Sequence, residues 1–138
     1  MKFFTAAVLS AAAVSASPVF TVSDFYAGCI PHSSQCSYSF GVIQPGTMET
    51  TPVQCDIMLG ATNGGNLPDV KEGQCKESSR TFNIVRSRKG LTLTVSQPVT
   101  PSSNQTGSHF IPNKQIVTSN EPNAMVQTYK GPKNFDLD

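Results

Sequence analysis

Four side chains of the types that move protons and bind anions are scattered along the sequence. They are His32, Glu77, Arg80 and His109, and the two histidines are the only ones in the chain. Imidazole and carboxylate groups can act as general acid and base, and a guanidinium can bind an anionic substrate. No Gly-x-Ser-x-Gly, His-Glu-x-x-His or Gly-rich phosphate-loop motif accompanies them. They are therefore isolated candidates rather than a recognised catalytic motif.

Small secreted ribonucleases combine two histidines, a glutamate and an arginine on a small sheet, which matches these four residues loosely. Those enzymes also have a substantial helix and an aromatic base-binding loop, and the sequence shows neither pattern. His32 lies in a loop between two cysteines, where an exposed histidine is common. We predict no catalytic residue, no metal ligand and no cofactor, and keep a small secreted enzyme or ribonuclease-like toxin as the alternative.

The cysteines are a second set with possible chemistry. Cys29, Cys36, Cys55 and Cys75 are separated by 7, 19 and 20 positions, which is wider than the spacing of paired zinc ligands. An even number in a small exported chain predicts two disulfides. Three pairings are possible, and we expect Cys29 with Cys36 and Cys55 with Cys75, because these close the shortest loops.

The N-terminus predicts export. Met1 and Lys2 precede an apolar run that extends to Ala16 and ends in small residues, which is typical of a signal peptide cleaved after Ala16. We therefore expect a signal peptide over residues 1–16 and a single secreted, extracellular domain over residues 17–138, without a membrane anchor. Only 14% of the residues are charged and the net charge is +1. This composition argues against a nucleic-acid partner.

The elements that must position these residues show a hydrophobic period of two, which is the pattern of β-strands. It is most regular over 36–42, 53–59 and 91–96, and no segment keeps a helical period for three turns. In the first strand Phe25 does not fall on the same face as Phe20 and Val22, and a bulge near Ser23-Asp24 would redirect it. Gly90 would supply the positive φ of a hairpin. Weaker strands are expected over 19–26, 80–86, 108–111, 115–118 and 124–130.

About eight short strands predict an all-β fold, either a small antiparallel β-barrel or a sandwich, held by two disulfides. A closed barrel would leave few unpaired strand edges. Irregular segments are expected over 45–52, 61–73 and 98–107. The last contains Asn104-Gln105-Thr106, the only N-glycosylation sequon, so Asn104 is a candidate glycosylation site in a polar loop.

Two loops are candidate partner-binding sites. Arg86, Arg88 and Lys89 form the densest positive cluster, which is either a solvated hairpin tip or a docking surface for an acidic protein. Pro31 and His32 lie in the loop closed by the expected short disulfide. Such a loop would lose little conformational entropy on binding.

Three segments carry a more specific pattern. They are Phe20–Ser33 with its continuation over Cys36–Phe40, the strand Gly90–Val95, and Tyr129–Phe135. Together they resemble the fungal hypersensitive-response-inducing elicitors, a group related to the Alternaria major-allergen family. The resemblance covers most of the chain after the signal peptide.

The resemblance implies a secreted, disulfide-bonded β-barrel that is not an enzyme and that plant tissue perceives as an elicitor or effector. It also implies a plant host protein as partner, of the thaumatin-like defence class. The allergen uses an additional cysteine for a covalent dimer, whereas two internal bridges use all four cysteines here, so we expect a monomer. No residue role carries over position by position.

Overall fold

The computed structural model describes residues 17–62, 64–119 and 125–138. The predicted signal peptide and its cleavage site lie outside these residues, as does Ala124 at the start of one predicted strand. The described residues form ten strands and one short 3-10 helix. In chain order these are β1 (Phe20–Cys29), β2 (Gln35–Ile43), β3 (Val53–Gly60), β4 (Val70–Gln74), β5 (Thr81–Ser87), β6 (Gly90–Thr100), β7 (Ser103–Pro112), η1 (Asn113–Gln115), β8 (Ile116–Thr118), β9 (Gln127–Tyr129) and β10 (Phe135–Leu137).

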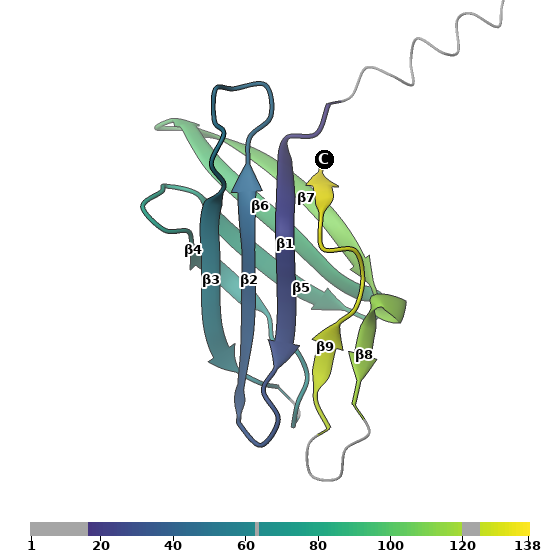
Figure 1. The fold of residues 1–138 in the computed structure, drawn as a ribbon. Coiled ribbons are helices and arrows are strands. Elements are labelled where there is room, and N and C mark those ends of the chain that lie inside the picture. Colours follow the sequence, from purple (N-terminus) through teal and green to yellow (C-terminus); the bar gives the residue numbers. More distant parts are fainter. Residues whose placement is uncertain (1–16, 63, 120–124) are drawn as a thin grey trace, which may run out of the picture.

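The strands form two antiparallel sheets that face each other (Figure 1). The front sheet has the order β3-β2-β1-β9-β8, and β10 pairs with the first residues of β1 on the same side as β9. The rear sheet has the order β4-β5-β6-β7. All pairings are antiparallel, so the predicted all-β class is confirmed.

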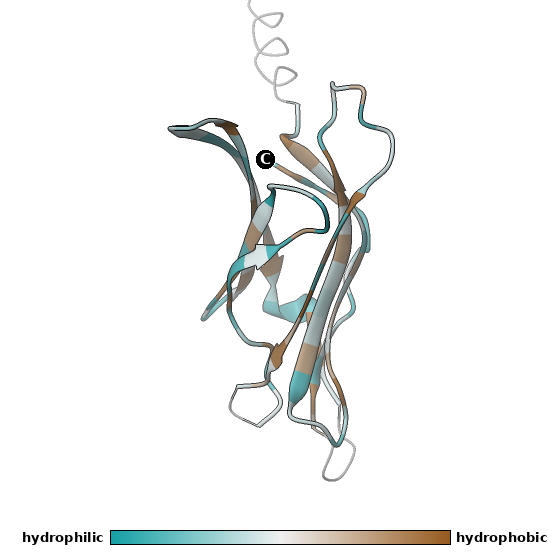
Figure 2. Cartoon of the chain, turned by 90° about the vertical axis from the view of Figure 1, so that its left-hand side faces the viewer, coloured by the Kyte–Doolittle hydropathy of each residue, from teal (hydrophilic) through white to brown (hydrophobic). Residues whose placement is uncertain are grey.

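Alternation along the strands fills the space between the sheets. On β2, Cys36, Tyr38 and Phe40 are buried, whereas the serines between them face outward and keep part of their exposure. Phe40 of the front sheet meets Phe82 of the rear sheet edge to face, with ring centroids 5.1 Å apart. Figure 2 shows hydrophobic segments recurring along the strands of both sheets. One hydrophobic core therefore holds the two layers together.

One side of the sandwich, which we call the disulfide edge, is joined covalently. Cys55 on β3 and Cys75 just after β4 form a disulfide and an isolated antiparallel bridge. Beside them the N–H of Lys76 donates to the carbonyl of Gln54 (2.8 Å). The front and rear sheets are thus linked through two adjacent contacts.

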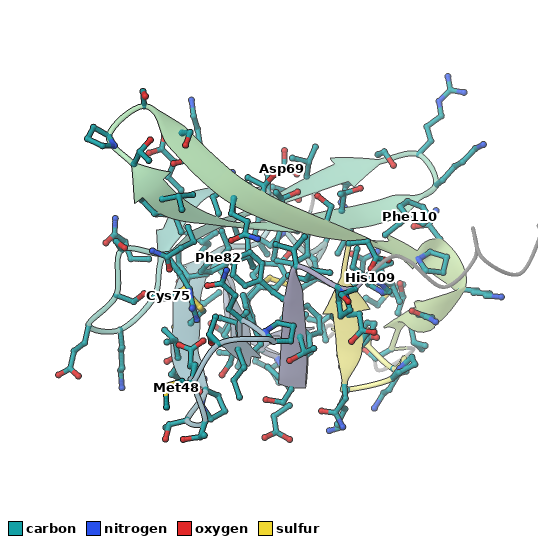
Figure 3. The ribbon with its side chains drawn as sticks, turned by 90° about the horizontal axis from the view of Figure 1, so that it is seen from above. Met48, Asp69, Cys75, Phe82, His109 and Phe110 are labelled. Atoms are coloured by element: carbon teal, nitrogen blue, oxygen red, sulfur yellow. A yellow bond between two sulfur atoms is a disulfide. The ribbon has the colours of Figure 1, made fainter. Side chains whose placement is uncertain are left out.

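The opposite side, which we call the C-terminal edge, is joined without a covalent bond. Ser108 on β7 and Asp138 just after β10 exchange two backbone hydrogen bonds of 2.9 and 3.0 Å. His109 stacks on Phe135, with ring centroids 4.1 Å apart, and Phe135 packs on Phe25. Figure 3 shows Cys75 and His109 on opposite sides of the molecule.

The sheets are not closed into a barrel. Of the two predicted architectures the sandwich is observed, and the expectation of a β-barrel domain is wrong. The physical reason is that few residues pair with one another along each of the two edges. Each edge supplies one bridge rather than a continuous ladder of hydrogen bonds, so the two sheets remain separate layers.

Both disulfides have the predicted pairing. Cys29 and Cys36 lie opposite each other on β1 and β2, so their bridge staples two neighbouring strands of one sheet. Cys55 and Cys75 bridge the two sheets. No cysteine is free.

Other local expectations have mixed outcomes. The bulge is confirmed, since the β1–β2 register shifts between Ser23 and Tyr26. The hairpin is confirmed too: Gly90 has φ 154°, and a Cβ there would lie 2.0 Å from the carbonyl oxygen of Ile111. The expected loop over 98–107 is wrong, because β6 and β7 extend through it to a short turn and place Asn104 on a strand.

Three methionines among the described residues are exposed, on different parts of the surface. Met48 is 96% exposed at the tip of the β2–β3 loop, at the end of the molecule seen in Figure 3. Met58 is on β3 and Met125 precedes β9, and both are more than half exposed.

Candidate functional site

The four candidate catalytic residues are not brought together. The N–H of Ala61, just beyond β3, donates to the β1–β2 turn that carries His32 (2.8 Å). The N–H of Lys76, next to Glu77, donates to Gln54 near the start of β3 (2.8 Å). The two turns therefore lie at opposite ends of β3, roughly 20 Å apart at the rise of an extended strand.

Arg80 is a structural residue rather than a substrate-binding cation. It is only 6% exposed, and its guanidinium donates to Gln97 (2.8 Å), to the carbonyl of Val42 (3.2 Å) and to Glu49 (2.9 Å). It also lies over the ring of Phe20, 5.4 Å from the centroid. Burial opposes ionisation of Glu49, but the hydrogen bonds from Arg80 and a backbone N–H lower its pKa overall. Arg80 ties the β2–β3 loop to the rear sheet.

The side chain of His109 likewise packs against its neighbours. Its ring stacks nearly parallel on Phe135, with an interplanar angle of 16°. Burial lowers the pKa of His109, and the nearby carboxylates of Asp138 and Asp136 partly oppose that shift. The imidazole therefore closes the C-terminal edge as an aromatic ring packed on Phe135.

The turn with Pro31 and His32 is exposed and tightly folded. The N–H of Ile30 donates to the carbonyl of Gln35 (2.9 Å), and the N–H of Ser33 donates to the carbonyl of Ile30 (3.1 Å). His32 has a positive φ of 60°, a conformation that is uncommon in a non-glycine residue. The Cys29–Cys36 disulfide closes the base of this turn.

A shallow hollow of about 620 Å³ lies beside this turn. The turn's His32, Ser33 and Ser34 line one side, and Met125 and Val126 line another. The described lining contains hydroxyl, imidazole and thioether groups but no carboxylate, Lys or Arg. Its chemistry suits weak, largely uncharged contacts.

Arg86, which we predicted to form a partner-binding cluster with Arg88 and Lys89, is only partly exposed. Two of its guanidinium nitrogens donate to the carbonyl of Leu67 (3.2 and 3.0 Å), and one also donates to the side chain of Gln127. Its own backbone N–H donates to Asp69 (2.8 Å). The side chain is half-buried and links β5, the β3–β4 connection and β9.

Arg88 and Lys89, in contrast, are exposed at the turn between β5 and β6. The side chain of Asn113 donates to the carbonyl of Arg88 (2.7 Å), and its backbone N–H donates to the carbonyl of Lys89 (2.9 Å). These bonds hold the turn against η1, the short helix at the right of Figure 1. The exposed Lys114 follows directly in η1.

A fourth cation joins this surface from the other sheet. The N–H of the exposed Lys130 donates to the carbonyl of Gln115, the last residue of η1 (2.7 Å). We call Arg88, Lys89, Lys114 and Lys130 the basic rim. Sequence reasoning missed two of its members, because positions 114 and 130 become neighbours of the turn only through η1.

The described residues contain neither a metal-binding cluster nor a membrane-spanning helix. No group of three or more His, Cys, Asp or Glu side chains is arranged to hold a metal ion. No described helix has the length and apolar character needed to cross a membrane.

No family model, no curated protein and no solved structure matches the chain. A proposal of function therefore rests on the surface chemistry of the described residues.

Proposed function

We propose that this protein is a secreted, non-enzymatic elicitor or effector that plant tissue perceives through a host defence protein. The observation that carries the proposal is the basic rim. Its four exposed cations come from three segments of the chain and lie around one short helix. The resemblance to fungal elicitors supplies the biological setting, and two disulfides are compatible with an extracellular protein.

The rim is suited to an acidic partner. Charges at the edge of an interface steer association and raise its rate, and they need no deep pocket. The β5–β6 turn that presents two of them is held by the backbone and side chain of Asn113, so it loses little freedom on binding. We propose a protein of the thaumatin-like class with an acidic surface as this partner, bound by a monomer of the present chain.

The test compares two double variants in leaf infiltration and in binding to acidic proteins of plant extracellular fluid. Arg88→Ser with Lys89→Ser removes two rim charges, and Lys71→Ser with Lys76→Ser removes two exposed charges elsewhere. We expect the first pair to weaken the leaf response and to slow association about tenfold at low salt, with little effect at high salt. We expect the second pair to behave as the wild type.

Two results would contradict the proposal. A folded, disulfide-bonded wild type without any effect on plant tissue would exclude the elicitor function. Equal behaviour of the two double variants would exclude the rim as the contact surface.

The enzyme alternative has its own test. His32→Ala combined with His109→Gln removes both imidazoles and leaves an amide of similar size in the C-terminal edge. Retained leaf activity is expected. Hydrolysis of RNA by the wild type that is lost in this double variant, with an unchanged circular dichroism spectrum, would replace the elicitor proposal by an enzyme.

A further inference from the structure

The strand β7 is a long edge of the rear sheet without charged side chains. Exposed strand edges pair with other chains, and proteins block them with charged side chains, bulges, prolines or short strands. From Ser103 to Pro112, β7 contains no Lys, Arg, Asp or Glu, and it is ten residues long. Its exposed Phe110 adds an apolar side chain next to the edge.

The other sheet edges carry recognisable protection. The edge strand β4 has the charged Glu72, whose positive φ (53°) lies where the register with β5 shifts. The edge strand β3 carries Asp56 and is bridged through Cys55. The edge strand β8 has three residues. Among the described edge strands, only β7 is both long and free of charged side chains. Its proline, Pro112, is the last residue of the strand, and the register shift with β6 lies at the turn, between Pro98 and Thr100.

Part of the β7 edge is already occupied. The N–H and C=O of Ser108 are bonded to Asp138 at the C-terminal edge, so the backbone groups of Ser108 point away from β6. In an antiparallel strand this direction repeats every second residue. The backbone groups of Asn104 and Thr106 therefore also point away from β6. Within the described residues, neither of them has a backbone partner on that side.

The sequon lies on this open stretch. The side chains of Asn104 and Thr106 are exposed, whereas those of Gln105 and Gly107 between and after them are at least partly buried. Gln105 accepts a hydrogen bond from the side chain of Gln44, which directly follows β2, so Gln105 faces the front sheet. Asn104 thus points outward at a fixed place beside the open edge.

We propose that Asn104 carries an N-linked glycan and that this glycan prevents β7 from pairing with a second copy of the chain. In the reaction, the oligosaccharide is transferred from a lipid pyrophosphate donor of the secretory pathway to Nδ2 of Asn104. The bond between sugar C1 and the phosphate oxygen breaks, a C1–Nδ2 bond forms, and the amide loses one proton as the lipid pyrophosphate leaves. The inference rests on the proposed secretion, because only a chain that enters this pathway meets the donor.

The test expresses the full chain with its own leader in a secreting yeast. The variants are Thr106→Ser, which keeps the sequon, Thr106→Val, which destroys it with a β-branched residue of similar shape, and Thr106→Lys, which destroys it but places a charge beside the edge. Intact mass before and after enzymatic removal of the glycan reports modification of Asn104. Light scattering after size exclusion reports association.

We expect the wild type and Thr106→Ser to be glycosylated monomers. Thr106→Val should be unmodified and should self-associate about tenfold more tightly, whereas Thr106→Lys should be unmodified and monomeric. Secreted wild type without a glycan would overturn the inference and leave the proposed secretion intact. Monomeric Thr106→Val would overturn the protective role. Chain found only inside the cells, without a glycan, would overturn the secretion and this inference with it.

Discussion

The two edges at which the sheets meet are held together by different interactions. At the disulfide edge a single covalent bond between Cys55 and Cys75 holds the layers together, with one hydrogen bond beside it. At the C-terminal edge, two backbone hydrogen bonds and the stacked pair of His109 and Phe135 take its place. The covalent edge constrains the unfolded chain, whereas the other edge acts only in the folded state. The two edges should therefore respond differently to substitution and to pH.

The largest effect is expected from breaking the disulfide edge. Cys55→Ala with Cys75→Ala should lower the free energy of unfolding by about 3 kcal/mol, because the open chain gains the entropy of a long loop. Denaturation in urea, followed by circular dichroism, measures the loss. The matched control is Cys29→Ala with Cys36→Ala, which opens a shorter loop between strands that are already paired. A greater loss in the control than in the first pair would contradict the comparison.

A smaller effect is expected at the C-terminal edge. Phe135→Ala should lower the free energy of unfolding by about 2 kcal/mol, since this half-buried ring contacts both Phe25 and His109. Phe135→Leu keeps most of the apolar volume and should lose less than half as much. The same urea titration measures both variants. Equal losses for alanine and leucine would show that ring stacking does not hold this edge.

The smallest effect is the pH dependence of the same edge. Burial lowers the pKa of His109 in the folded state, so between that pKa and the ordinary value near 6.5 the unfolded chain binds more protons. The free energy of unfolding should therefore fall as the pH drops below about 6.5, and this part should vanish in His109→Gln. Glu49 and Asp56 have lowered pKa values and act only below about pH 4.5. An unchanged pH profile in His109→Gln would contradict this assignment.

Regular alternation made much of the fold predictable. Along most of β2 and β3 each residue is alternately more and less buried than its neighbours, so their strands and faces follow from the sequence. Strands β4 and β10 were missed for different reasons. Strand β4 is short, charged and bulged, and β10 has three residues that are strand only because they pair with β1.

The candidate site was less predictable, because its members meet only in three dimensions. Arg86 and Arg88 look alike in the sequence, yet Arg86 is drawn inward by bonds to Leu67 and Asp69, which are 19 and 17 positions away. The membership of Lys114 in the rim depends on Asn113 docking against a turn 25 positions earlier. No local pattern carries such information.

The oxidation of each of the three exposed methionines reports on a different part of the surface. Hydrogen peroxide adds one oxygen atom to an accessible thioether, and each oxidised peptide is resolved by its mass. Met48 would report on the β2–β3 loop, Met58 on the strand β3 and Met125 on the hollow beside the β1–β2 turn. Since the basic rim contains no methionine, a partner confined to the rim leaves all three rates of oxidation unchanged. The methionines of the native chain thus serve as footprinting probes for locating a bound protein, without any engineered label.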